Sequence, residues 1–218
     1  MSGNLYRFIE NKYVTPKLAK CSAHSFTFTF QLGKNYIVAL GASAGGQKAL
    51  EEFFDNTLVD AISYVIVTHL QPDFKSYLTQ IIGKHSALQV CEAENNMLVE
   101  PNKVYVMPEN TTMTIEDNRL KLKKRDLALP LNHAIDIFFT SLSQQKEIDT
   151  IAIIFSGMGR DGRKGAEAIA ESGGLIIVQD PLTAQHPSMP AHVMKGRYAD
   201  LILSPKDMPQ HIRDYVEA

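Results

Sequence analysis

The sequence has few cysteines, no excess of either charge and no long apolar segment. Its two cysteines, Cys21 and Cys91, are too few for a disulfide framework and lack metal-ligand spacing, so we expect reduced thiols in a cytoplasmic protein. The 22 basic and 24 acidic residues nearly cancel, which gives no sign of binding to nucleic acid or an acidic membrane. No segment is long enough for a membrane helix, and no signal-peptide core is present. We expect a soluble protein that acts on a small or protein substrate.

The 218 residues suit one large α/β domain, which we place at 35–218. Residues 1–34 form an N-terminal arm that is too short for a domain, and its alternating segment SFTFTF (25–30) suits one edge strand. From residue 36 onward, strand and helix patterns alternate, which predicts a three-layer α/β/α fold with a mostly parallel, doubly wound sheet. Strands are expected at 36–40, 62–68, 89–91, 104–107, 150–155, 175–178 and 201–203.

Helical periodicity predicts helices after residue 46 and at 74–82, 133–142 and 163–172, with a short one after 190. The second of these is expected to end at Gly83, and a last helix is expected to start with Ser204 as its cap and Pro205 in its first position. Alternation at 112–115 and 119–123 around Asp117 and Asn118 predicts a small antiparallel β-hairpin.

The stretch 35–54, NYIVALGASAGGQKALEEFF, reads as strand, tight turn and helix. Its residues 41–45, GASAG, fit the G-x-S-x-G spacing that exposes a serine hydroxyl on a sharp bend, so Ser43 is a candidate nucleophile. A glycine-rich turn of this kind can also bind phosphate or simply pack tightly. The motif alone does not choose between these interpretations.

Two further polar residues follow strands of the same predicted sheet. His69 ends the second strand and Asp161 follows the apolar strand at 150–155, so both fall on the carboxyl edge with Ser43. A serine needs a histidine to take its proton and a carboxylate to hold the imidazole, which makes a Ser-His-Asp triad possible. His69 could instead be a buried histidine bonded to a loop carbonyl, and Asp161 could be the N-cap of the next helix. Asp180 competes as the acid, and an α/β-hydrolase order would require His186 or His192 as the base.

Three sequence blocks point to one family. The GASAGG block holds Ser43, the TH-x-x-P-x-F block holds Thr68, His69, Pro72 and Phe74, and the GMGRDG block holds Met158 and Asp161. In this order and spacing they resemble the chemotaxis receptor methylesterase family, CheB. The similarity runs from about residue 36 to the C-terminus and includes VEPNKVYVMPEN at 99–110.

The resemblance implies that Ser43 attacks the methyl ester of a glutamyl side chain, with His69 as base and Asp161 orienting it. Methanol then leaves and water hydrolyses the acyl-enzyme, and the family also deamidates certain glutamines. Met158 is assigned to the oxyanion hole, and Ala44 and Gly45 to the same oxyanion and substrate-binding group. The implied partners are methyl-accepting chemotaxis receptors, with methyltransferase or sensor-kinase partners as further candidates.

The sequence departs from the family pattern in two places. Residues 1–34 cannot form the receiver domain that controls many members. Residues 131–136, LNHAID, share only Asp136 with the Arg-Pro-Ser-Val-Asp stretch of many members. We predict no metal and no cofactor, because no residues have metal-ligand spacing. The alternatives are a catalytically silent regulatory domain and a nucleotide-binding module that uses the glycine-rich turn.

Overall fold

The structure is a computed structural model that describes residues 35–58, 61–69, 77–126 and 133–218. Residues 33–218 form one compact unit. The predicted N-terminal arm with its strand at 25–30 lies outside the described residues, as do Pro72 and Phe74. In the described part, no helix is long and apolar enough to cross a membrane.

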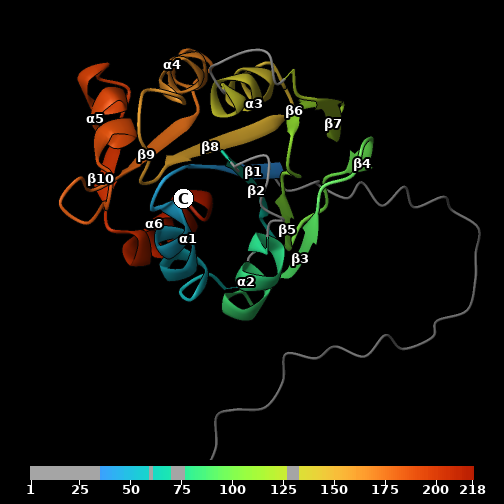
Figure 1. The fold of residues 1–218 in the computed structure, drawn as a ribbon, viewed down its shortest axis with the longest axis horizontal. Coiled ribbons are helices and arrows are strands. Elements are labelled where there is room, and N and C mark those ends of the chain that lie inside the picture. The colour runs from blue at the N-terminus through green and yellow to red at the C-terminus, as the bar shows by residue number, and fades with distance from the viewer. Residues whose placement is uncertain (1–34, 59–60, 70–76, 127–132) are drawn as a thin grey trace, which may run out of the picture. The chain divides into compact units, whose positions relative to one another are not determined.

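The core of this unit is a seven-stranded sheet in the order β10-β9-β8-β1-β2-β5-β3, in which all neighbours are parallel (Figure 1). The strands are β1 (Asn35–Ala42), β2 (Ser63–Thr68), β3 (Gln89–Glu92), β5 (Lys103–Val106), β8 (Ile148–Ile154), β9 (Leu175–Gln179) and β10 (Leu201–Leu203). Strand β2 pairs with β1 on one side. Strand β8, which comes later in the chain, pairs with β1 on the other side. The strand order therefore reverses beside β1, where parallel α/β sheets place their ligand sites.

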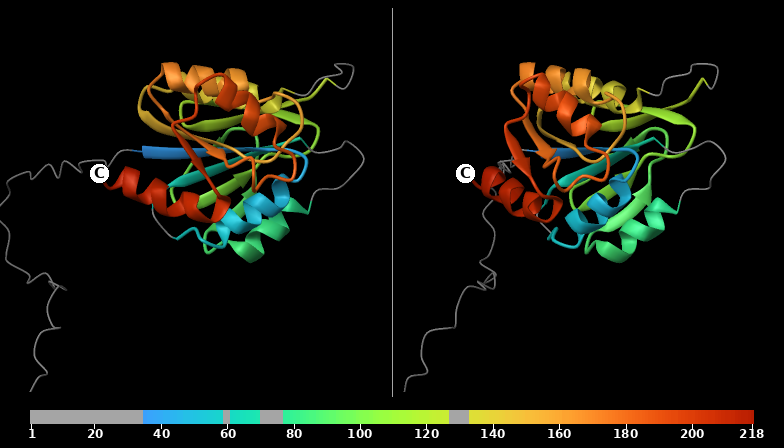
Figure 2. Two further views of the ribbon diagram at one scale, coloured as in Figure 1. Left: turned by 90° about the vertical axis from the view of Figure 1, so that its left-hand side faces the viewer. Right: turned by 60° about the vertical axis from the view of Figure 1, so that its left-hand side comes forward.

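Helices cover both faces of this sheet, as Figure 2 shows. Successive β1 residues alternate: Ile37 and Ala39 pack with α3 (Ala134–Ser143), α4 (Arg163–Glu171) and α5 (Ser188–Lys195). Val38 and Leu40 pack on the opposite side with α1 (Gly46–Phe54), α2 (Leu78–His85) and α6 (Met208–Val216). Because a strand points successive side chains to opposite faces, strands that are apolar throughout must be covered twice. The predicted three-layer, doubly wound fold is confirmed.

The predicted β-hairpin is confirmed, but it belongs to a three-stranded sheet. Strands β6 (Thr111–Glu116) and β7 (Arg119–Lys124) pair antiparallel, and the two turn residues Asp117 and Asn118 both have positive φ. Strand β4 (Met97–Leu98) adds a short third strand beside β7 and was not predicted from the sequence. Two residues are too few for an alternating pattern to be visible in a sequence.

Helix ends differ from the predictions at three places. Helix α2 continues through Gly83 to His85, because a glycine inside a helix weakens it without ending it. Helix α5 begins at Ser188, before Pro190 and not after it. A 3-10 turn, η1 (Pro205–Asp207), precedes α6, and the Ser204 hydroxyl donates to the Asp207 carboxylate without capping a backbone N–H. Ser204 thus lies at the expected N-cap position with Pro205 first in the turn, but its side chain caps no backbone N–H.

Candidate active site

Ser43 lies in the turn between β1 and α1, at the point where the strand order reverses. Gly45 in this turn has a φ of 72°, and a Cβ there would lie 2.7 Å from the Gln185 side chain and 2.9 Å from Ser156 Oγ. Only glycine fits such a crowded, left-handed position. The Ser43 N–H donates to the Ser156 carbonyl at 3.0 Å, which joins the turn to the loop after β8.

His69 directly follows β2, which is parallel to β1 with Ala42 opposite Thr68. Its ring lies between the two other predicted residues. Ser43 Oγ is 3.2 Å from His69 Nδ1, and His69 Nε2 is 2.5 Å from Asp161 Oδ2. The structure therefore brings Ser43, His69 and Asp161 into one hydrogen-bonded chain, with the connectivity of a Ser-His-Asp triad. The imidazole remains 19% exposed, so the open side of this chain is accessible.

Asp161 comes from the loop after β8 and is 5% exposed. Besides His69, its carboxylate accepts the N–H groups of Ile135, Asp136 and Gly162 at 2.9–3.0 Å. Two of these donors lie in the first turn of α3, whose N–H groups have no partner within the helix. The alternative that Asp161 caps the helix that follows it is therefore wrong, since it binds the start of α3 and α4 has no side-chain cap.

These hydrogen bonds also affect the pKa of Asp161. Burial alone would raise the pKa of Asp161, but the hydrogen bonds from His69 and the backbone outweigh burial and lower this pKa. The neighbouring Asp136 accepts the Gly165 N–H at 2.9 Å, and burial together with the charge of Asp161 raises the pKa of Asp136. Of the two carboxyl groups, Asp161 therefore ionises more readily, and it is the one that faces His69.

His133, Asp136 and Asp161 are the one group of His, Cys, Asp or Glu in the described ranges whose ligand atoms lie close enough to share an ion, within 4.8 Å. His133 Nδ1 is 3.8 Å from Asp136 Oδ2 and 4.0 Å from Asp161 Oδ1, and its side chain is 47% exposed. The carboxylates of Asp136 and Asp161 already accept hydrogen bonds from backbone N–H groups and from His69. These bonds explain why the two carboxylates lie close together. The absence of a metal stays a prediction.

The alternative candidates for the acid and the base, Asp180, His186 and His192, make hydrogen bonds elsewhere. Asp180 Oδ1 accepts the Leu182 N–H in its own loop, and His192 Nδ1 is bonded to the Ser188 carbonyl. The backbone of His186 bonds to the loop after β8, and its ring lines a pocket. His69 is thus the histidine that contacts Ser43 among the described residues.

The predicted oxyanion residues lie in the turn that holds Ser43 and in the loop that is hydrogen-bonded to this turn. Ala44 and Gly45 follow it directly in the turn, and Met158 lies in the loop after β8, two residues beyond the Ser156 carbonyl that binds Ser43. The N–H groups of Ser43 and Gly157 are occupied, by Ser156 and His186 respectively. Those of Ala44, Gly45 and Met158 donate no hydrogen bond to a described residue. The Met158 side chain itself is 63% exposed.

The groups that hold the loop after β8 were not predicted from the sequence. Gln179, at the end of β9, is 2% exposed, and its Oε1 accepts the Ser156 N–H at 2.7 Å. Ser156 Oγ in turn bonds to the Ala44 carbonyl at 2.9 Å. A glutamine that ends an apolar strand was the available signal, because a buried amide needs partners.

Known proteins resemble this chain over most of its length. The model of the CheB methylesterase family matches residues 38–212. A protein-glutamate methylesterase/protein-glutamine glutaminase of Thermotoga maritima is 30% identical over 204 residues, which cover 91% of this chain and 59% of that protein. A protein of the same name from Maricaulis maris is 33% identical over 79% of this chain and 44% of its own length. The chain thus spans about half the length of these curated relatives.

A solved structure supports the same assignment. The crystal structure of the Thermotoga maritima CheB methylesterase catalytic domain superimposes with a TM-score of 0.74 at 28% identity, covering 83% of this chain and 98% of that one. The fold of this chain therefore agrees with that of the solved catalytic domain. The chain belongs to the CheB methylesterase family.

Proposed function

We propose that this chain is a cytoplasmic hydrolase that cleaves glutamyl methyl esters on methyl-accepting chemotaxis receptors and deamidates receptor glutamines. The observation that carries the proposal is the hydrogen-bonded chain from Ser43 through His69 to Asp161. It lies at the carboxyl edge of the sheet of a CheB-family protein, beside the strand-order reversal. Relatives that bear the name protein-glutamate methylesterase/protein-glutamine glutaminase support the substrate class.

Ser43 serves as the nucleophile and His69 as the base. As Ser43 Oγ attacks the ester carbonyl, its proton moves to His69 Nδ1, and the ionised Asp161 stabilises the resulting imidazolium. His69 then gives this proton to the leaving methoxide, so methanol departs and a glutamyl ester of Ser43 remains. A water molecule, deprotonated by His69, hydrolyses that ester and frees the glutamate. With a glutamine substrate the leaving group is ammonia.

The oxyanion of the tetrahedral intermediate is proposed to lie at the backbone of Met158, with Ala44 and Gly45 as the other donors. Their N–H groups are without a described acceptor, whereas those of Ser43 and Gly157 are occupied. An N–H aimed at the developing charge is typically worth about 3 to 4 kcal/mol in the transition state. The proposal thus assigns the chemistry to free backbone donors and not to the exposed Met158 side chain.

The experiment measures methanol release from methylated receptor fragments by the wild type and by Ser43→Ala. Removal of a triad nucleophile is expected to lower the rate by about four to six orders of magnitude. Equal rates in the two proteins would rule out Ser43 as the nucleophile. Labelling of the folded wild type, but not of Ser43→Ala, by a fluorophosphonate separates an active hydrolase from a silent regulatory domain. Calorimetric titration with nucleotides tests the remaining rival, a nucleotide-binding module.

A further inference from the structure

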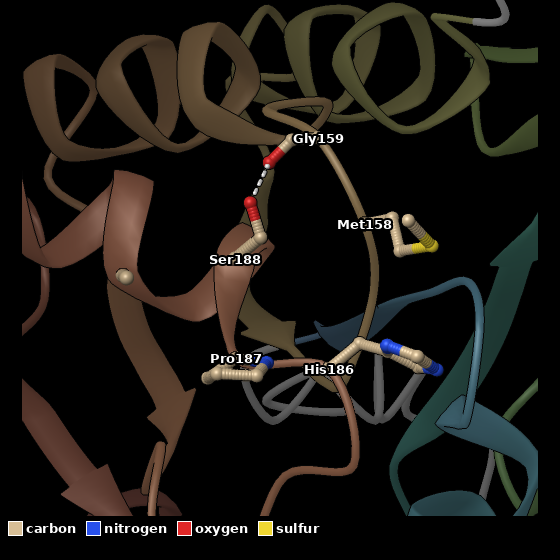
Figure 3. A pocket seen from close by; sticks show the side chains of 6 residues that line it. Met158, Gly159, His186, Pro187 and Ser188 are labelled. Carbon is tan, nitrogen blue, oxygen red and sulfur yellow. Dashed lines mark hydrogen bonds between the residues drawn. The ribbon is translucent and has the colours of Figure 1, made fainter.

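A pocket of about 300 Å³ lies between the loop after β8 and the start of α5. Six residues line it: Met158, Gly159, His186, Pro187, Ser188 and Ala191. Figure 3 shows these residues around the opening, with the side chains of Met158 and His186 extending to the same side. Neither the triad nor the proposed oxyanion donors need a pocket of this size.

The walls of this pocket are bonded to residues that touch Ser43. A Cβ on Gly157 would lie 2.9 Å from the Ser43 Cβ, so this backbone packs directly on the proposed nucleophile. The Gly157 N–H donates to the His186 carbonyl at 2.9 Å, and the Met189 N–H donates to the Gly157 carbonyl at 3.0 Å. A substrate carbonyl at the Met158 N–H therefore has the pocket next to it, because Met158 also lines the pocket.

The chemistry of the walls favours an apolar occupant. Ser188 Oγ donates to the Gly159 carbonyl at 3.0 Å (Figure 3), and the Ser188 carbonyl is bonded to His192 Nδ1. The pocket therefore meets carbon atoms of Met158, Pro187 and Ala191, and the His186 ring is the one ionisable group on its wall. Burial of an apolar side chain against such a wall is favourable, whereas a carboxylate would lose its hydration without a buried partner.

Exposed cations lie beyond the pocket on the same loop and the start of α4. Arg160 follows the pocket residue Gly159, and Arg163 and Lys164 begin α4 with exposed side chains. A protein segment in which some glutamates are unmethylated carries free carboxylates, which these cations attract. The charge pattern fits a segment with an apolar residue for the pocket and acidic residues around it, and so favours a protein chain over a neutral small ester.

We infer that this pocket selects substrates by binding the apolar side chain of a residue near the glutamyl methyl ester in the receptor segment. The inference rests on the proposed function, since it assigns a substrate preference to the same site. Ala191 is the key position, because its small side chain on α5 leaves the space open. A larger residue there would fill the pocket from the helix side and remove the preference.

The test uses soluble peptides with one glutamyl methyl ester, in which leucine or alanine occupies each of the four positions on either side. In the wild type, leucine at one or more positions is expected to raise kcat/KM at least tenfold over alanine, as burial of an apolar group in a pocket does. In Ala191→Phe this ratio is expected to fall below about threefold. The ratio is taken within one protein, so a partial loss of folded enzyme does not change it.

Lys195→Phe is the matched control, since Lys195 is exposed one turn further along α5 and does not line the pocket. It should keep the leucine preference of the wild type. Ala191→Leu, a smaller insertion, provides the ratio if Ala191→Phe does not fold. Equal kcat/KM values for all peptides in the wild type, or an undiminished preference in the folded Ala191 variants, would overturn the pocket inference while leaving the proposed function intact. Hydrolysis of none of the peptides or receptor fragments would overturn the proposed function, and the pocket inference with it.

Discussion

His69 presents Nδ1, and not Nε2, to the Ser43 hydroxyl, at 3.2 Å. Its Nε2 faces the Asp161 carboxylate at 2.5 Å. In the serine-protease triad the two nitrogens have the opposite roles. Because an ionised carboxylate can only accept, the hydrogen must sit on Nε2, which leaves the Nδ1 lone pair for the serine proton. The proposed reaction needs the neutral tautomer with its proton on Nε2, and the contact with Asp161 favours that tautomer.

This arrangement predicts that neutral His69 carries its proton on Nε2. The measurement is long-range 1H–15N correlation NMR on histidine-labelled protein at a pH where the imidazole is neutral, with His69→Gln to assign the signals. Asp161→Asn should disturb the tautomer and lower kcat by about 10⁴-fold, as loss of the orienting carboxylate does in other triads. A proton found on Nδ1 in the wild type would contradict the assigned roles.

The lowered pKa of Asp161 predicts how stability depends on acid. A carboxyl whose folded pKa lies below its unfolded value of about 3.9 stabilises the fold above that value and loses this contribution as the pH falls through the folded pKa. Asp161→Asn is expected to cost about 1 to 3 kcal/mol at pH 7, because charge-assisted bonds to three backbone N–H groups weaken.

Urea unfolding at a series of pH values measures this cost. The difference between wild type and Asp161→Asn should stay constant from pH 8 to about pH 5 and shrink below about pH 4. The groups that face Asp161 are His69, His133 and Asp136. His133→Asn controls for the contact between that imidazole and Asp161. A difference that grows on acidification would contradict the lowered pKa.

Asp136 gives the opposite pH dependence. Burial and the charge of Asp161 raise its pKa, so its contribution to stability is present below the unfolded pKa and is lost as the pH rises through the folded pKa. Asp136→Asn keeps an oxygen to accept the Gly165 N–H but cannot ionise. The variant should gain stability relative to wild type between about pH 4 and pH 8. Thermal unfolding across this range measures the gain, and a relative loss at high pH would contradict it.

The close approach of Gly157 to the site predicts a large effect of one methyl group. A Cβ there would lie 2.0 Å from Met189 Sδ and 2.9 Å from the Ser43 Cβ, so the loop after β8 must move away from Ser43. Gly157→Ala is expected to destabilise by about 1 to 3 kcal/mol and to lower kcat about 10²-fold through misplacement of the loop.

Gly83→Ala is the matched control. Gly83 lies inside α2, where a Cβ meets no atom within 4 Å. The alanine should stabilise the protein by about 0.5 to 1 kcal/mol through helix propensity and leave kcat as in the wild type. Melting temperatures and ester hydrolysis rates of both variants make the comparison. Similar effects of the two substitutions would show that the close contacts of Gly157 have no special importance.

Much of this architecture could be read from the sequence, because the sheet depends on patterns that are local in the chain. The run 150–155 predicts a doubly covered strand, and β8 is that strand, extended by two residues at its start and one shorter at its end. The alternation around Asp117 and Asn118 predicts the hairpin for the same reason. The edge shared by Ser43, His69 and Asp161 follows from parallel strands alone, since each residue comes at the carboxyl end of one.

The details that were missed depend on contacts between distant segments. Asp161 accepts N–H groups from Ile135 and Asp136, about 25 residues earlier, and no local pattern marks a carboxylate that will cap another helix. The orientation of the His69 ring is set by those same contacts. The pocket is formed by the loop after β8 and by the segment that leads into α5, which are distant in the sequence.

The N–H of Met158, which has no acceptor among the described residues, provides a last prediction. If the oxyanion binds this N–H, activity depends on the backbone donor and not on the side chain, which is 63% exposed. Met158→Pro removes the donor, whereas Met158→Ala keeps it. The proline variant should have a kcat about 10² to 10³ times lower than the alanine variant on a glutamyl methyl ester, as expected for the loss of one oxyanion donor. Circular dichroism confirms that both variants are folded, and labelling by a fluorophosphonate confirms that Ser43 is still accessible. Equal kcat values in the two folded variants would show that the oxyanion lies elsewhere, and the N–H groups of Ala44 and Gly45 would then be the donors to test.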